Sequence, residues 1–137
     1  MAKKTLVTEM KSLVETYREQ NHLFSLVMMI PTEPTALDSK YTVLVSAPWL
    51  DDLLLKDAID RILYDLIEQL GSTESPLYRK LSRIAVRHSN DPFVQEITSV
   101  LEVDIDTGEL MIQNCTIHGV HVERAIILES RELLVYA

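Results

Sequence analysis

Cysteine, glycine and proline are scarce in this chain, which has one cysteine, three glycines and five prolines among 137 residues. The lone thiol, Cys115, cannot form a disulfide within the chain, and this favours a reducing compartment such as the cytoplasm over secretion. The low glycine and proline contents exclude a collagen-like or low-complexity chain. We therefore expect a folded cytoplasmic protein.

Long apolar runs are absent as well. A helix that crosses a bilayer needs about eighteen or more apolar residues in a row, and no stretch of this sequence approaches that length. The chain starts with Lys3 and Lys4, as a signal peptide would, but Glu9, Lys11 and Glu15 then interrupt the apolar region that a signal peptide requires. We expect neither a membrane anchor nor a secretion signal.

Basic residues are outnumbered. Thirteen Lys and Arg residues stand against twenty-one Asp and Glu residues, which gives a net charge of −8. A domain of this charge repels nucleic-acid phosphates and anionic lipids, so we expect neither as a partner. The densest basic set is too sparse to reverse this expectation. It comprises Arg79, Lys80, Arg83 and Arg87.

The rest of the composition is that of an ordinary globular protein, with 47% hydrophobic and 25% charged residues. A chain of this length buries roughly two thirds of its unfolded surface around one core. We therefore expect residues 1–137 to form a single domain.

Hydrophobic periodicity predicts helices that alternate with strands. The predicted helices span residues 4–20, 55–70 and 92–101. The predicted strands include residues 22–30, 41–47, 81–88 and 120–128. The order α-β-β-α-β-α-β-β-β indicates an α+β fold, in which a mixed sheet ends in a C-terminal antiparallel meander and the helices pack on the sheet.

Local signals mark the helix ends. Asp51 and Asp52 are expected to cap the second helix, with Leu55 first on its buried stripe. Gly71 can take the left-handed position after the last turn of that helix. Asp91 is the expected N-cap of the third helix, directly before a proline that suits the first helical position.

His88, Ser89 and Asp91 are a candidate catalytic group at the turn from a strand to a helix, where enzymes often place reactive side chains. Their residue types suit acid–base and nucleophilic chemistry. However, a serine next to a histidine in sequence is not a catalytic pair, because the base must reach the hydroxyl in space and needs an orienting partner. Helix capping explains Ser89 and Asp91 without catalysis, and we favour capping.

Cys115, His118 and His121 are three potential metal ligands at spacings of three. Positions three apart on a regular strand point to opposite faces, so the three converge only if the turn at Gly119 folds the segment back. The segment also lacks a paired zinc motif and a fourth ligand. We expect no metal here, and no other cofactor.

Arg83 and Arg87 are expected on one face of the third strand, where forked hydrogen bonds can hold a carboxylate or phosphate. In a chain with an excess of negative charge, cross-strand ion pairs are the simpler interpretation. Acidic partners for such pairs are available at Glu102, Glu123 and Glu129.

No catalytic, cofactor or nucleic-acid motif is complete, so we predict a small soluble interaction or accessory protein that acts through protein–protein contacts. Self-association as a homodimer is expected, because residues 22–30 are apolar on both strand faces and residues 133–136 form a short apolar tail. A sheet with helices on both sides would instead hide these residues within one chain.

The alternative is a small hydrolase or transferase that uses the turn formed by His88, Ser89 and Asp91, with Trp49 lining the pocket. An enzyme should bring His88, Asp91 and Trp49 into one concave site. An interaction protein should instead show these residues capped, packed in the core or far apart. For Trp49 by itself the first interpretation is a core residue, although a tryptophan after a proline at a strand end can also line a pocket.

Overall fold

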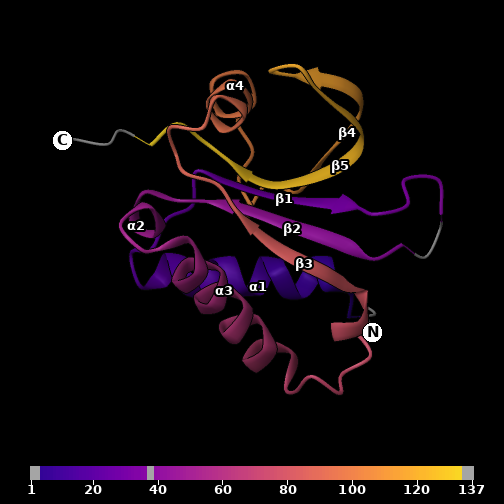
Figure 1. Ribbon diagram of the computed structural model, residues 1–137. Coiled ribbons are helices and arrows are strands. Elements are labelled where there is room, and N and C mark those ends of the chain that lie inside the picture. The colour runs from indigo at the N-terminus through magenta and orange to yellow at the C-terminus, as the bar shows by residue number, and fades with distance from the viewer. Residues whose placement is uncertain (1–3, 37–38, 134–137) are drawn as a thin grey trace.

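The computed structural model describes residues 4–36 and 39–133. The helices are α1 (Leu6–Glu19), α2 (Pro48–Asp51), α3 (Leu55–Leu70), the short 3-10 helix η1 (Tyr78–Lys80) and α4 (Pro92–Val100). The strands are β1 (Leu26–Pro31), β2 (Tyr41–Ser46), β3 (Leu81–Val86), β4 (Leu110–Ile117) and β5 (Val120–Ser130). The predicted α+β class and order of elements are confirmed (Figure 1). No helix in these two ranges is long and apolar enough to cross a membrane.

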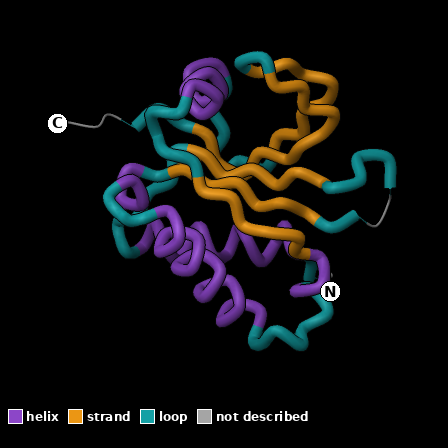
Figure 2. The backbone as a smooth tube through the Cα atoms, viewed as in Figure 1, coloured by secondary structure: helices purple, strands orange, loops and turns teal. Residues whose placement is uncertain are grey.

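The strands of the described ranges form one mixed sheet in the order β3-β2-β1-β5-β4. β1 pairs antiparallel with β2 and with β5, and β4 pairs antiparallel with β5. β2 and β3 run parallel, because the connection through α2 and α3 carries the chain back to the end of the sheet where β2 begins. Figure 2 shows the strands as a twisted layer with helices on either side.

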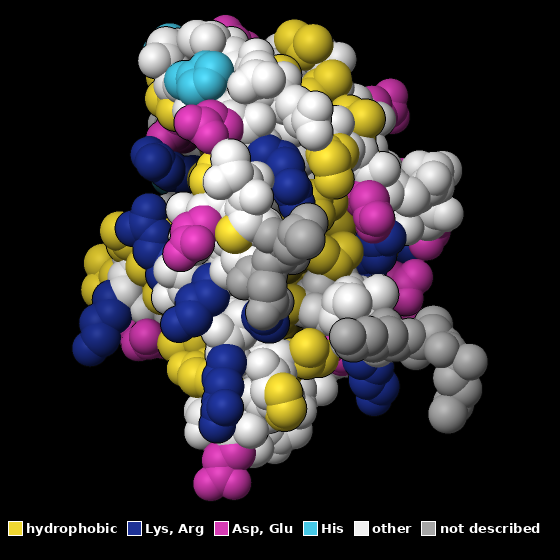
Figure 3. All heavy atoms as spheres, turned by 90° about the vertical axis from the view of Figure 1, so that its right-hand side faces the viewer, with side chains coloured by type: hydrophobic (Ala, Val, Ile, Leu, Met, Phe, Trp, Pro, Cys, Tyr) yellow, Lys and Arg dark blue, Asp and Glu magenta, His cyan; other side chains and the backbone are white. Residues whose placement is uncertain are grey.

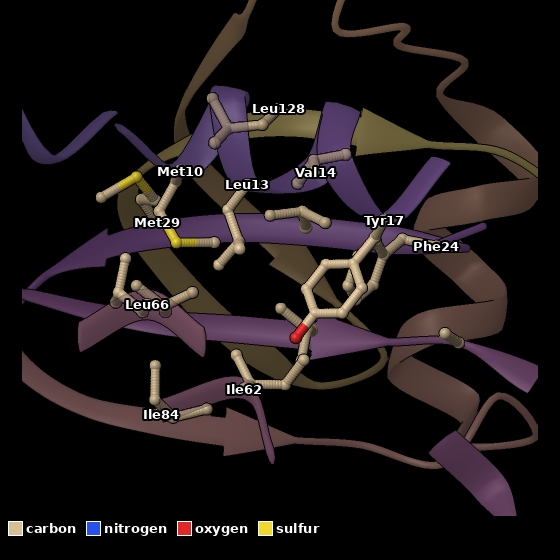
Figure 4. Close-up of a cluster of buried hydrophobic side chains, with 14 of the residues drawn as sticks. Met10, Leu13, Val14, Tyr17, Phe24, Met29, Ile62, Leu66, Ile84 and Leu128 are labelled. Atoms are coloured by element: carbon tan, nitrogen blue, oxygen red, sulfur yellow. The ribbon is translucent and has the colours of Figure 1, made fainter. Parts of the chain in front are cut away.

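α1 and α3 cover one face of the sheet (Figure 1). Both helices are amphipathic, so each buries one apolar stripe against the strands. Burying each large side chain fully contributes about 1.5–3 kcal/mol to folding. The buried side chains between the layers include Met10, Leu13, Val14 and Tyr17 of α1, Ile62 and Leu66 of α3, and Met29, Ile84 and Leu128 of the sheet (Figure 4).

α4 and the curved β4–β5 hairpin cover part of the other face (Figure 1). Phe93, Val94 and Ile97 of α4 form a second buried cluster with Leu26 and Met28 of β1. Within this hairpin, Asn114 adopts a positive φ of 52° and is missing from the residue pairs of β4 and β5, whose register is the same on either side of it.

β1 is therefore covered on both faces by elements of its own chain. Val27 and Met29 point into the cluster beneath α1 and α3, while Leu26 and Met28 point into the cluster beneath α4. The two apolar faces of this strand thus give no reason for self-association, contrary to the sequence-based argument. Residues 134–137 of the apolar tail lie outside the described residues.

The start of the second long helix also differs from the prediction. Pro48 begins the separate short helix α2, which ends at Asp51, and α3 begins only at Leu55. Neither Asp51 nor Asp52 therefore caps α3. Its N-cap is Leu54, whose side chain makes no capping hydrogen bond, and Leu55 is exposed rather than buried.

Two other predicted helix ends are confirmed. The side chain of Asp91 accepts a hydrogen bond from the N–H of Phe93 (2.9 Å) and so caps α4. Gly71 follows α3 with a φ of 98°, a backbone conformation that residues with a Cβ atom adopt only with strain.

A charged network joins the end of β5 to α1. The Arg18 guanidinium donates to both carboxylate oxygens of Asp106 at 2.9 Å and lies 3.5 Å from Asp104. Arg131 pairs with Asp104 (3.4 Å) and with Glu129. Burial raises the pKa of Glu129, whereas the backbone N–H of Asp106, followed by the two arginines, lowers the pKa of Asp104.

Candidate functional site

A cleft of about 470 Å³ opens on the side of the sheet that carries α4. One wall comes from the β4–β5 turn and the first part of β5, and another from the start of α4. Phe93, Leu44 and Val122 are buried and form an apolar floor. Pro34 closes one end, where its carbonyl accepts a hydrogen bond from Nη1 of Arg124 at 3.4 Å.

The alternation of β3 puts two arginines into this cleft. Ile84 is buried against the α3 side, so Arg83, Ala85 and Arg87 point to the opposite face. Because β2 and β3 are in parallel register, Arg83 lies beside Thr42. The placement of both arginines on one strand face agrees with the sequence analysis.

The cross-strand ion pairs that the sequence favoured for these arginines do not form. Within the described ranges, Arg83 makes no hydrogen bond or ion pair, although Glu123 lines the same cleft. Arg87 pairs instead with Asp91, at 3.4 Å. The side chain of Glu129 is engaged by Arg131. Arg83 therefore presents a guanidinium with all its donors available for a ligand.

Arg124 of β5 is the third arginine of the cleft, and the sequence analysis did not single it out. Its Nε atom is buried and has no hydrogen-bond partner among the described residues. A buried donor without a partner costs about 1–3 kcal/mol, so a rearrangement on binding that brings an acceptor to this N–H would recover a cost already present in the free protein.

The cleft is locally basic in an acidic chain. Arg83, Arg87 and Arg124 outnumber the acidic lining residues Asp91 and Glu123, whereas the whole chain has a net charge of −8. Figure 3, seen from the right-hand side of Figure 1, shows Lys and Arg side chains spread over this end of the molecule, with acidic side chains among them. Apolar walls lower the local dielectric and strengthen the field of these arginines.

His118 and His121 stand at the mouth of the cleft, in and after the hairpin turn. His118 has a positive φ of 46°, and its backbone N–H donates to a carboxylate oxygen of Glu96 at 2.6 Å. Cys115 does not line the cleft, and its thiol lies 3.4 Å from the carbonyl oxygen of Gln113. Among the described residues, no three side chains of metal-ligating type converge, so these three do not form a shared ligand set.

His88 and Ser89 lie in a different place, a hollow of about 770 Å³ beside the end of α2. The N–H of Ser89 donates to Oδ1 of Asp51 (3.0 Å), and the Ser89 hydroxyl donates to Oδ2 of the same carboxylate. Nδ1 of His88 accepts a hydrogen bond from the N–H of Asn90 (3.1 Å) and is 3.8 Å from Asp51. The serine hydroxyl is thus bonded to a carboxylate, not to the histidine, and the arrangement fixes the turn onto α2.

Trp49 belongs to neither site. Its ring packs against Tyr17, Phe24 and His22, and its Nε1–H donates to the Leu23 carbonyl at 3.0 Å. The neighbouring Tyr17 hydroxyl donates to Asp65, and burial, then that bond, raises the tyrosine pKa. Trp49 is therefore part of an aromatic cluster on the α1 side of the sheet.

The structure thus brings Arg83, Arg87 and Asp91 together in the cleft, whereas His88 and Ser89 line the hollow beside α2 and Trp49 lies in the aromatic cluster. It adds Arg124 to the first group and Asp51 to the second. Arg124 carries no sequence signal beyond its place on a strand, and nothing in the sequence connects Asp51 with a serine 38 residues away. Comparison of the chain with protein-family models, with curated proteins and with solved structures found no match.

Proposed function

We propose that the protein is a small interaction protein that binds an acidic segment of a partner protein in the cleft and has no catalytic role. One observation carries this proposal: Arg83, which has no partner in the described part of the chain, shares an apolar cleft with Arg124, whose buried Nε also has none. Guanidinium groups with unused donors beside a hydrophobic floor bind carboxylates strongly, through charge-assisted and forked hydrogen bonds.

The size and lining of the cleft favour a short segment with both acidic and apolar residues. Pockets of about 300–1,000 Å³ accept a few side chains, and apolar lining with a few placed polar groups is their usual composition. Phe93 and Val122 would contact an apolar side chain, while Arg83 and Arg124 would hold the carboxylate of a neighbouring Asp or Glu.

The net charge of −8 favours a protein segment over a nucleic acid. A long polyanion is repelled by the acidic remainder of the surface. A segment with one or two carboxylates feels mainly the local field, because salt screens charges that are farther away than about 8 Å.

A peptide selection tests the proposal. A displayed library of random peptides is selected on the wild-type protein, and the selected peptides are measured by calorimetry against Arg83→Gln and Arg79→Gln variants. We expect enrichment of Asp or Glu next to an apolar residue, and an affinity at least about tenfold lower for Arg83→Gln, since charge-assisted hydrogen bonds contribute about 1.5–3 kcal/mol.

Arg79→Gln is the matched control, because Arg79 lies in η1 and does not line the cleft. It should leave the affinity within about twofold, as expected for a charge remote from the binding site. Selected peptides without acidic residues, or equal losses in the two variants, would contradict the proposal.

Homodimer formation remains part of the proposed function. The covering of β1 by its own chain removes one argument for it, but another surface supports it and is described below.

The alternative, a hydrolase or transferase that uses His88, Ser89 and Asp91, receives less support from the geometry. Asp51 accepts both donors of Ser89, and Asp91 caps α4 on the cleft side. A serine nucleophile needs a base within hydrogen-bond reach of its hydroxyl, and the only group bonded to this hydroxyl among the described residues is a carboxylate that also holds the turn.

A further inference from the structure

Three consecutive leucines are exposed where α2 passes into α3. Leu53, Leu54 and Leu55 are 40%, 75% and 61% exposed, and we call them the leucine patch. The patch lies beside α2 at the left-hand end of α3 in Figure 1. Single exposed apolar side chains are common, but contiguous ones next to a hollow mark a contact surface.

The same residues also leave the N-terminus of α3 without a side-chain cap. α3 has 16 residues, yet its N-cap is Leu54, which makes no side-chain capping bond. The other long helices are capped by Thr5 and Asp91. Leucine is among the poorest N-caps, and a serine or aspartate at this position would satisfy a free N–H. Local rules that fail together at one place are typical of a functional surface.

An apolar hollow adjoins the patch. It has a volume of about 150 Å³ and is lined by Leu50, Ala58 and Val86, by Leu53 and Leu55 of the patch, and at its polar side by Asp51, Arg87 and His88. A protruding leucine and a hollow of side-chain size thus lie next to each other on one surface. This is what a twofold interface needs, because the same patch must fit itself when two copies meet.

The charges around the patch point to a second copy rather than to a strongly charged partner. Asp52, Lys56 and Asp57 flank the leucines and are exposed. Within residues 4–36 and 39–133, none of the three makes an ion pair. Both signs are present, so Lys56 of one copy can face an aspartate of the other across a twofold axis.

We propose that the leucine patch is a homodimer interface in which Leu54 of each copy enters the hollow of the other copy, lined by Leu50, Ala58 and Val86. The interface lies at the α2–α3 junction, and Leu54, which enters the hollow, does not line the arginine cleft. A dimer with this interface would carry two clefts.

Analytical ultracentrifugation of the full chain over a range of micromolar concentrations tests this proposal. We expect a reversible dimer for the wild-type protein, and a dissociation constant at least about tenfold higher for Leu54→Ser, because burial of a leucine is worth about 1.5–3 kcal/mol. Serine also supplies the missing N-cap, so the variant monomer should remain folded by circular dichroism. The loss of dimer is then not a loss of fold.

A second variant and a control complete the experiment. Leu55→Gln should also weaken the dimer, whereas Val100→Ser should not, because Val100 is equally exposed (75%) but lies at the end of α4. A wild-type monomer throughout the concentration range would overturn the proposal. So would a dimer that both leucine variants leave unchanged, or one that Val100→Ser weakens as much as they do.

Discussion

Replacement of Asp51 by alanine is a sharp test of the structure, because the sequence treats Asp51 and Asp52 as equivalent helix caps and the structure does not. Asp51 receives two hydrogen bonds from Ser89, one from the N–H at 3.0 Å and one from the hydroxyl. Its side chain is only 11% exposed. Asp52 is exposed and makes no ion pair in the part of the chain that the structure describes.

The expected magnitude follows from these contacts. A hydrogen bond to a charged group contributes about 1.5–3 kcal/mol, and two bonds to one carboxylate are not fully additive. Low exposure means little screening by solvent, so we expect Asp51→Ala to lower the free energy of unfolding by about 3 kcal/mol. Asp52→Ala should change it by no more than about 0.5 kcal/mol, as is usual for surface positions.

Urea denaturation followed by circular dichroism measures both variants. Ser89→Ala and the double variant complete a double-mutant cycle. The coupling energy from this cycle reports the hydrogen bond between the Ser89 hydroxyl and the Asp51 carboxylate. Equal destabilisation by Asp51→Ala and Asp52→Ala would refute the reasoning, since it would mean that both aspartates act as caps or that neither matters.

Two further predictions concern the core and the charged network. Tyr17→Phe should lower the free energy of unfolding by about 1–2 kcal/mol, because the part-buried hydrogen bond to Asp65 is lost. Urea denaturation checks this, with Tyr64→Phe at an exposed position as the unaffected control. The pKa of Asp104 is lowered in the folded protein, so the stability that this group contributes is present above its ordinary value of 3.8 and is lost as the pH falls through the folded value. Thermal melts between pH 5 and pH 2, about the range in which a carboxylate titrates, should therefore show a shallower loss of stability for Asp104→Asn than for the wild type, and parallel curves would contradict this.

The sequence predicted the fold well where local physical signals were strong. Apolar residues recur at helical spacing through α1 and α3, and such periodicity directly indicates which face is buried. Asp91 before a proline marked the start of α4, because capping chemistry is local. The start of α3 was misplaced, since Pro48 initiates a separate turn of helix and a run of leucines does not show which of them are covered.

The site was less predictable because it depends on distant parts of the chain. The alternation of β3 placed Arg83 and Arg87 on one face, but whether acidic residues reach them is decided by strand order and by the curvature of the β4–β5 hairpin (Figure 1). Arg124 enters the cleft only because the hairpin curves over the sheet. The contact between Asp51 and Ser89 likewise follows from the position of α2 beside the end of β3, which no local pattern encodes.

The most direct test of the proposed binding function is an NMR titration that observes the arginine Nε–H groups. The probe is the acidic peptide with the highest affinity in the selection. The control is its Asn/Gln analogue, in which Asn or Gln replaces each Asp or Glu. When the acidic peptide binds, the Nε–H of Arg83 should shift and exchange more slowly with water. The buried Nε–H of Arg124, which has no partner among the described residues, should shift with it. Assignments come from Arg83→Lys and Arg124→Lys variants. If both resonances stay unchanged while the acidic peptide binds, or if the Asn/Gln analogue shifts them equally, the cleft is not the site that recognises carboxylates.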